Sequence, residues 1–180
     1  KVHELGQEVL VHLPMQAPKT FSIKKHPYKI TVGMTENDCY RNIAKAFATV
    51  PFARGMNNHV GSRATRVPVL MDHLMEAYAS YADKQNMHLY FLDSRTIAHS
   101  LGYSAAQRAG LSAFKRYVFL DGIETETYIN GQLNALLSIA KKNGSAIGIA
   151  HVRPVTMKTL ARHLPQMTAE AEFVHLSSLL

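Results

Sequence analysis

Cysteine is nearly missing from this chain of 180 residues, which holds a single copy, Cys39. One cysteine excludes an internal disulfide framework and a zinc cluster built from several thiolates. No run of apolar residues approaches the roughly 18 that a membrane-spanning helix needs. We therefore predict no membrane span in this sequence. A single cysteine does not indicate whether the protein lies in an oxidising or a reducing compartment.

The motifs of several large enzyme classes are missing as well. No G-x-S-x-G turn marks a serine nucleophile, and Cys39 falls on the apolar face of a predicted helix. No G-x-G-x-x-G follows a predicted strand, and no phosphate-binding loop of the Walker type occurs. The sequence therefore lacks the markers of nucleophile-based catalysis and of the common nucleotide-binding folds.

Acidic residues are few, 13 against 20 lysines and arginines, which gives a formal net charge of +7. Such a charge raises nucleic acids and anionic surfaces as partners. The basic residues are scattered, however, and aromatic residues do not alternate with them as on a base-stacking platform. We expect a solvated surface biased toward acidic envelope polymers, and no nucleic-acid partner. A nucleic-acid binder would instead show steep, salt-dependent binding to DNA or RNA.

The chain does have the length and the apolar content of one packed domain. Its residues are 47% hydrophobic and 18% charged, and a domain of this size buries about 70% of its unfolded surface. We expect residues 1–180 to form a single domain. The opening KVHELGQEVLVHL resembles the end of a helix followed by a strand, so we also expect the chain to be a fragment whose N-terminal part is missing.

Short apolar runs alternate with longer amphipathic runs. The short runs predict strands at 8–13, 52–57, 88–93, 116–121, 145–151 and 172–176. The long runs predict helices at 35–50, 65–86, 104–109, 124–143 and 155–164. Strands of about five residues separated by helices are typical of βαβ units with a parallel sheet. The predicted fold class is therefore α/β, as an open sheet or a barrel.

Local signals support individual elements. Thr35 is a predicted N-cap with Asp38 in the first turn, and Pro51 ends that helix. Gly144 is positioned to end the helix at 124–143. The methionines and tyrosines between 65 and 86 recur at helical spacing, which favours a core face over cofactor contacts. The run SAIGIA is apolar on both faces, as in a strand covered on both sides.

Polar residues stand at the ends of five predicted strands. They are His12, the run Asn57-Asn58-His59, Asp93, Asp121 and His151. Parallel strands of an α/β fold end at one edge, so these side chains are predicted to converge there. Each also has an ordinary alternative, since an aspartate often caps a turn and a histidine is often satisfied locally. Their recurrence at equivalent positions favours a shared site.

The segment ARGMNNHVGSRAT, residues 53–65, is more polar than a simple connection requires. Gly61 and Ser62 precede a predicted helix, so their backbone N–H groups, with Arg63 beside them, are candidates for binding an anion or an oxyanion. Ser62 or Thr65 is alternatively a plain N-cap. Both interpretations can hold together.

Histidines and carboxylates from separate strands suit a borderline cation such as Zn²⁺. Such an ion acidifies water and polarises a carbonyl, which makes hydrolysis the natural reaction. The residues at the predicted rim therefore favour a metal-dependent hydrolase.

Five phrases carry a resemblance to a known family. They are GQEVLVHLPM, GMNNHVGSRAT, YFLDSRT, YVFLDG and AIGIAHVRPVTMKTL. Together, and in this order, they resemble the divergent polysaccharide deacetylase family, a bacterial envelope branch related to the carbohydrate-esterase polysaccharide deacetylases. The resemblance implies a distorted parallel (β/α) barrel of about seven strands, a divalent metal, and removal of acetyl groups from N-acetylated glycans.

The resemblance also implies metal ligands and a proton donor. Related deacetylases hold the metal with an Asp and a His-x-x-x-His motif; His12 stands at its first position, but Gln16 stands at its second. We expect His59 to supply the missing imidazole and a carboxylate from outside these residues to complete the site. His151 matches the general acid that protonates the leaving amine, and Asp93 is expected to orient it.

The remaining candidates are substrate contacts. They are Asn57, Asn58, Ser62 and Arg63, with Asp121 binding sugar hydroxyls or serving as a second carboxylate. The resemblance thus predicts a zinc-dependent carbohydrate deacetylase, a hydrolase of C–N bonds other than peptide bonds, in the periplasm or otherwise outside the cytoplasm. The alternative is an inactive envelope module on the same fold that binds a glycan or a protein. Release of acetate distinguishes the two.

Overall fold

The computed structural model describes residues 2–18 and 26–180. The chain divides into two compact units, the first comprising Lys1–Lys115 and His175–Leu180 and the second comprising Arg116–Val174. Each unit has its own core of buried apolar side chains. That residues 1–180 form one domain stays a prediction.

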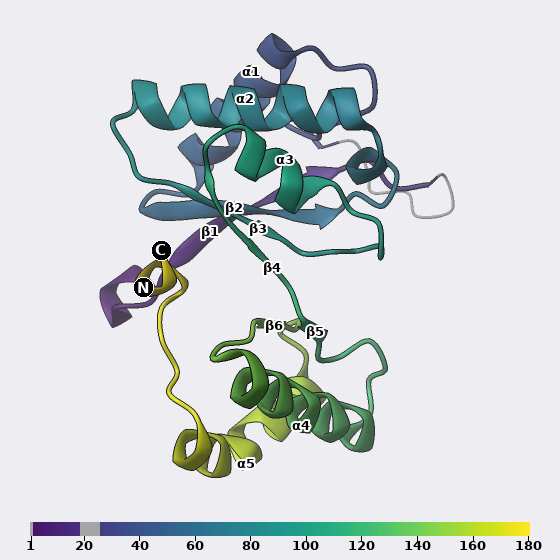
Figure 1. Cartoon of the computed structure of the whole chain (residues 1–180), viewed down its shortest axis with the longest axis vertical. Helices are drawn as coiled ribbons and strands as arrows, with labels where there is room; N and C mark the ends of the chain where they lie inside the picture. The colour runs from purple at the N-terminus through teal and green to yellow at the C-terminus, as the bar shows by residue number, and fades with distance from the viewer. Residues whose placement is uncertain (1, 19–25) are drawn as a thin grey trace. The chain divides into compact units, whose positions relative to one another are not determined.

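A four-stranded parallel sheet forms the centre of the first unit. The strands are β1 (Val9–Met15), β2 (Ala53–Val60), β3 (Tyr90–Asp93) and β4 (Ser112–Lys115), paired in the order β1-β2-β3-β4. The helices are α1 (Glu36–Thr49), α2 (Pro68–Lys84) and α3 (Gly102–Arg108), which lie on the same side of the sheet (Figure 1). Sequential strands joined by helices are also the arrangement found in a (β/α) barrel.

The helices bury the faces that their periodicity predicts. Cys39 and Ile43 of α1 are fully buried, and so are Met71 and Met75 of α2. The α2 residue Tyr78 is buried too, and its hydroxyl donates to the Tyr90 carbonyl at 3.0 Å. The predicted core role of this methionine and tyrosine face is confirmed.

The predicted start of α1 is confirmed as a capping box. The Asp38 N–H donates to the Thr35 hydroxyl oxygen at 3.2 Å, and the Thr35 N–H donates to the Asp38 carboxylate at 3.0 Å. Two N–H groups that a helix start leaves unpaired are thereby satisfied.

The second unit is smaller. Its two strands, β5 (Val118–Phe119) and β6 (Gly148–Ile149), are paired in parallel. Along the chain, α4 (Glu126–Asn143) follows β5, and α5 (Pro154–Glu170) follows β6. Ile129 and Leu133 of α4 pack with Met167 of α5 in its core. Gly144 ends α4 with φ of 83°, as predicted, because glycine adopts this left-handed conformation without steric cost.

The α/β class with parallel strands is confirmed, and three details differ from the sequence prediction. β4 was not predicted, because its four residues, SAFK, do not alternate between apolar and polar side chains. The strand predicted at 145–151 pairs only over Gly148–Ile149, because its partner β5 has only two residues. Gly148 and Ile149 are half-buried. The strand predicted at 172–176 is wrong, because residues 172–175 are irregular and a 3-10 turn, η3, spans Leu176–Leu179.

Along residues 2–18 and 26–180, no helix combines the length and the apolar character that crossing a lipid bilayer requires.

Candidate functional site

Two imidazoles lie side by side on the first two strands. β1 and β2 are paired so that His12 is opposite Asn57 and Pro14 is opposite His59. The ring centroids of His12 and His59 are 4.6 Å apart, with an angle of 54° between the ring planes. The structure therefore brings together the two histidines that the sequence predicted as metal ligands.

Asn57 links His12 to the loop that follows β3. Its side-chain oxygen is 2.9 Å from Nδ1 of His12, and its side-chain nitrogen donates to the Ser94 hydroxyl at 3.1 Å. An amide oxygen can only accept, so Nδ1 carries the proton and Nε2 is the nitrogen suited to a metal ion. Asn57 thus fixes both the ring orientation and the tautomer of His12.

Asn58 points the other way and is buried, with 1% of its surface exposed. Its side-chain oxygen accepts from the Ser94 N–H at 2.8 Å, and its side-chain nitrogen donates to the Val60 carbonyl at 2.9 Å. Alternate residues of a strand face opposite sides of a sheet, so only one member of the Asn57-Asn58 pair can face the histidines. Asn58 fastens two loops, which differs from the substrate contact predicted for it.

Asp93 is equally buried, at 1% exposure, and its carboxylate organises its own loop. It accepts from the Arg95 N–H at 2.8 Å, the Ser100 hydroxyl at 3.0 Å and the Tyr103 N–H at 3.0 Å. A Cβ added at Gly102 would lie 2.9 Å from its Oδ2, so the chain passes close to the carboxylate. These contacts make Asp93 a loop-forming residue, whereas the sequence predicted that it orients His151.

The loops after β2 and β3 carry strained backbone. Val60 has φ of 49° and Arg95 has φ of 45°, both in the left-handed region that side chains with a Cβ disfavour. The Val60 carbonyl accepts from the Thr96 hydroxyl at 3.1 Å, which joins the two loops. Such strain costs about 1–3 kcal/mol per residue and persists where surrounding contacts hold it, often at binding sites.

The turn at residues 61–66 pairs the backbone N–H groups that follow Gly61 and Ser62, whose own N–H groups were predicted to bind an anion. The backbone N–H groups of Arg63 and Ala64 donate to the Gln16 carbonyl at 3.2 and 3.0 Å. The Thr65 N–H donates to the Gly61 carbonyl at 2.8 Å. Neither Ser62 nor Thr65 is the N-cap of α2, because a 3-10 turn lies between and Val67 takes that position.

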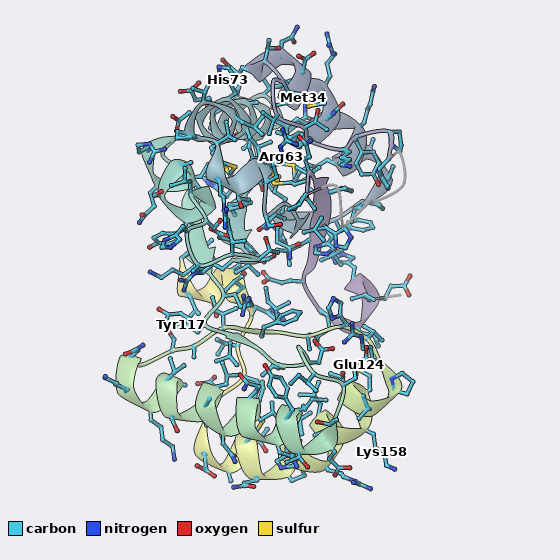
Figure 2. The ribbon with its side chains drawn as sticks, turned by 90° about the vertical axis from the view of Figure 1, so that its right-hand side faces the viewer. Met34, Arg63, His73, Tyr117, Glu124 and Lys158 are labelled. Carbon is cyan, nitrogen blue, oxygen red and sulfur yellow. The ribbon has the colours of Figure 1, made fainter. Side chains whose placement is uncertain are left out.

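Arg63 itself is exposed on this turn. Figure 2 labels it in the same unit as Met34 and His73. Those two residues are joined by a hydrogen bond of 3.1 Å between the His73 ring and the Met34 carbonyl. Ser62, next to Arg63 in the sequence, is half-buried. The role of Ser62 and Arg63 as substrate contacts stays a prediction.

Gln16 connects three segments of the first unit. Besides its carbonyl bonds to the turn after β2, its side-chain oxygen accepts from the Val32 N–H at 2.8 Å. Its own N–H donates to the Ile30 carbonyl at 2.8 Å. The residue at the second histidine position of the resembled motif thus has a structural role in this chain.

A second cluster lies in the second unit and joins His151 to Asp121. The Asp121 carboxylate is fully buried and accepts from the His151 N–H at 2.9 Å and from the Thr156 hydroxyl at 3.0 Å. Its other oxygen is 3.2 Å from Nδ1 of His151, whose side chain is 51% exposed. The structure therefore pairs His151 with Asp121, and burial argues against the sugar contact predicted for Asp121.

The electrostatics of this pair follow from its hydrogen bonds. Burial by itself raises the pKa of Asp121, but the bonds from His151 and Thr156 and the charge of His151 outweigh it, so the pKa is lowered from its ordinary value of 3.8. Arg153 adds a bond from its guanidinium to the Asp121 carbonyl at 3.0 Å and an ion pair with Glu124 at 3.2 Å. Figure 2 labels Glu124 at this end of the second unit.

The surroundings of His12 supply part of the donor set of a metal site. Within the described ranges, no group of three or more His, Cys, Asp and Glu side chains is placed to hold one. Two neighbouring imidazoles, one of them oriented through Nδ1, nevertheless have the donor chemistry that Zn²⁺ accepts. His12 and His59 therefore fit a divalent cation as two of its ligands.

Sequence reasoning missed several residues of both clusters. They are Ser94 and Gln16 in the first unit and Arg153 and Thr156 in the second. Each lies within or next to a phrase that carried the family resemblance, so the phrases pointed to the right segments. Their roles depend on which strand or loop each side chain meets, which spacing alone does not specify.

A model of a family described as divergent polysaccharide deacetylase matches residues 1–180. The chain belongs to that family. The family resemblance seen in the sequence is thereby confirmed.

Two curated relatives share this family's sequence pattern. The chain is 37% identical over 180 residues to an uncharacterized protein, YibQ, of Escherichia coli, covering all of this chain and 54% of the relative. It is 35% identical over 174 residues to an uncharacterized protein of Haemophilus influenzae, covering 97% of this chain and 59% of the relative. The chain thus spans little more than half the length of the curated relatives it matches.

A solved structure shows the same fold. The crystal structure of the uncharacterized protein ATU2773 from Agrobacterium tumefaciens matches with a TM-score of 0.88 and 23% identity, covering 99% of this chain and 70% of that one. At this identity the match shows the α/β fold.

Proposed function

We propose that this chain belongs to a metal-dependent hydrolase that removes acetyl groups from an N-acetylated polysaccharide of the bacterial envelope, outside the cytoplasm. The observation that carries the proposal is the pair of rings of His12 and His59, 4.6 Å apart on adjacent strands, in a member of the divergent polysaccharide deacetylase family. The relatives extend well beyond the matched region, so the activity proposed is that of the whole protein.

His12 and His59 would hold a divalent cation such as Zn²⁺, with a carboxylate from outside these 180 residues completing the set. A bound divalent cation supplies Lewis-acid chemistry, acidifying water and polarising a carbonyl. Asn57 keeps His12 in the orientation that this requires, through its bond to Nδ1. Outer partners of this kind typically affect metal affinity by 10–100-fold.

His151 would protonate the leaving amine. Its imidazole is half-exposed, so it can meet a substrate, while the buried carboxylate of Asp121 holds Nδ1 and stabilises the charged ring. In this proposal Asp121 takes the orienting role first predicted for Asp93. Asn57, Ser62 and Arg63 are the proposed contacts to substrate.

The test uses the metal-loaded full-length protein. We expect it to release acetate from acetylated chitooligosaccharide or peptidoglycan fragments, and we expect His12→Ala and His59→Ala to lower both metal stoichiometry and acetate release. His163→Ala is the matched control, because that ring binds the Thr159 carbonyl within its own helix. Undiminished metal content in both His12→Ala and His59→Ala would refute the metal assignment.

A second candidate is an inactive envelope module that binds a glycan or a protein. It is favoured by Gln16, which stands where the resembled motif has a histidine and is bound to Val32 instead. This candidate predicts glycan binding with no acetate release from the metal-loaded protein. The same pair of measurements therefore separates the two candidates.

A further inference from the structure

A cavity of about 370 Å³ lies at the opposite edge of the first unit's sheet from His12 and His59. Its lining includes Glu8, which precedes β1, Phe52 and Arg54 at the start of β2, and His88 and Tyr90 at the start of β3. Parallel strands begin at one edge and end at the other. The cavity is therefore separate from the proposed catalytic histidines, and its size is within the range of small-ligand sites.

The cavity lining includes a hydrogen-bonded pair of polar side chains, Tyr90 and Glu8. Tyr90 is 1% exposed, and its hydroxyl donates to the Glu8 carboxylate at 3.1 Å. The same oxygen accepts from the Ser177 N–H at 3.2 Å, which fastens the final turn of the chain beside the start of β1 (Figure 1). Burial by itself raises the pKa of Glu8, but these bonds outweigh it and lower the pKa from 4.5. Glu8 is thus a charged, oriented acceptor.

Gly55 makes the position of Tyr90 in this lining possible. A Cβ added at Gly55 would lie 2.4 Å from the Tyr90 carbonyl oxygen and 2.9 Å from its ring. Only a residue without a side chain lets Tyr90 lie so close to β2 and direct its hydroxyl to Glu8.

The lining also includes an exposed aromatic ring, that of Phe52. Phe52 is 64% exposed, and its ring stacks on His3 with centroids 4.3 Å apart and an angle of 6° between planes. Its φ of 68° lies in the left-handed region, so an apolar side chain is presented to solvent at a conformational cost. Strain of this kind concentrates at ligand sites.

We propose that this cavity is a second binding site, for a saccharide ring that carries a carboxylate. A pyranose ring has an apolar CH face, which matches the exposed Phe52 ring, and an edge of hydroxyl groups, which match Glu8 as acceptor. The guanidinium of Arg54, always charged, is suited to a carboxylate on the sugar. The lining also includes His3, His88 and His175, and among the side chains that the structure describes there, Glu8 is the only carboxylate.

The proposal goes beyond the hydrolase and does not depend on it. A site at the starts of the strands would hold one part of an envelope polymer whether or not another part is deacetylated.

The probe is glucuronic acid, with glucose as the matched neutral sugar, added to the full-length protein. We expect glucuronic acid to bind, and its ring CH protons to receive saturation transferred from protein aromatic protons in NMR. Phe52→Gly should weaken binding at least tenfold while leaving thermal stability unchanged or higher, because glycine relieves the left-handed strain. Arg54→Gln should remove the preference for glucuronic acid over glucose.

Matched controls are Phe173→Ala, an exposed phenylalanine of the second unit, and Arg66→Gln, an exposed arginine on the turn before α2. Both should bind glucuronic acid as the unchanged protein does. So should His12→Ala, which separates this site from the proposed catalytic one. No binding of glucuronic acid, or wild-type binding by both Phe52→Gly and Arg54→Gln, would overturn the proposal.

Discussion

The imidazole of His151 rests against the buried carboxylate of Asp121, with 3.2 Å between Nδ1 and Oδ1. The backbone N–H of His151 donates to the same carboxylate, so both the ring and the main chain of this residue are fixed by one group. The ring is thus exposed while its Nδ1 is held by a buried carboxylate.

Asp121→Asn should impair this arrangement without removing side-chain volume. We expect a loss of stability of about 1–3 kcal/mol, because one acceptor of the carboxylate becomes an NH₂ group facing a donor. If the full-length protein deacetylates a glycan, its kcat should fall with little change in KM. Denaturant unfolding and acetate release measure the two effects. Glu124→Gln, which changes an exposed carboxylate, is the control.

Acid should weaken the second unit through protonation of Asp121. The folded pKa of Asp121 is lower than its ordinary value of 3.8, so its ionised form stabilises the fold above that value. The contribution is lost as the pH falls from about 3.8 through the lowered folded pKa. Unfolding free energies measured from pH 6 down to pH 2 should therefore decline more steeply in the unchanged protein than in Asp121→Asn. Parallel curves would contradict this assignment.

Gly55→Ala should be strongly destabilising, by about 2 kcal/mol or more, because the added Cβ meets backbone at 2.4 Å. Gly131→Ala offers a matched control with the opposite sign. Nothing lies within 4 Å of a Cβ at that position in α4, and alanine favours a helix by about 0.5–1 kcal/mol. Thermal unfolding of the two variants tests both expectations.

Cys39 should be unreactive in the folded protein. Its side chain is fully buried in α1, and burial, with the charges of Asp38 and Glu36, raises its pKa to about 12. A chromogenic disulfide reagent that reacts with free thiols should therefore label Cys39 only as the protein unfolds. Rapid labelling at neutral pH without unfolding would show that the helix packs differently.

Neighbouring asparagines should give opposite phenotypes. Asn57→Ala should lower metal affinity about 10–100-fold, because it frees the His12 ring to rotate. Asn58→Ala should instead cost about 1–3 kcal/mol of stability, because it leaves the buried Ser94 N–H without its acceptor. Metal titration and denaturant unfolding of both variants distinguish the two roles. Equal effects of the two changes on metal affinity would contradict the geometry.

Much of the fold could be predicted because it depends on local chemistry. The capping box at Thr35, the buried face of α2 and the end of α4 at Gly144 each arise within a few residues of sequence. The short strands were less predictable. β4 was missed, and the strand predicted at 145–151 pairs only over Gly148–Ile149, because pairing with the neighbouring strand sets where each strand begins and ends.

The candidate site divides in the same way. Strand direction was enough to predict that His12 and His59 lie at neighbouring positions, and the phrases of the sequence identified the family. Which aspartate meets His151, and which asparagine meets His12, follows from burial and strand register. Asp121 and Asp93 both follow an apolar strand and are indistinguishable by spacing.

The sequence by itself determined the family, the α/β class and the segments that carry polar side chains, because these depend on residue type and on periods of two and 3.6 along one chain. Tertiary structure decided the partners of those side chains and the cavity around Glu8, Phe52 and Tyr90. Hydrogen bonds and cavities join residues that are far apart in sequence, and their geometry is set only when the strands and loops pack.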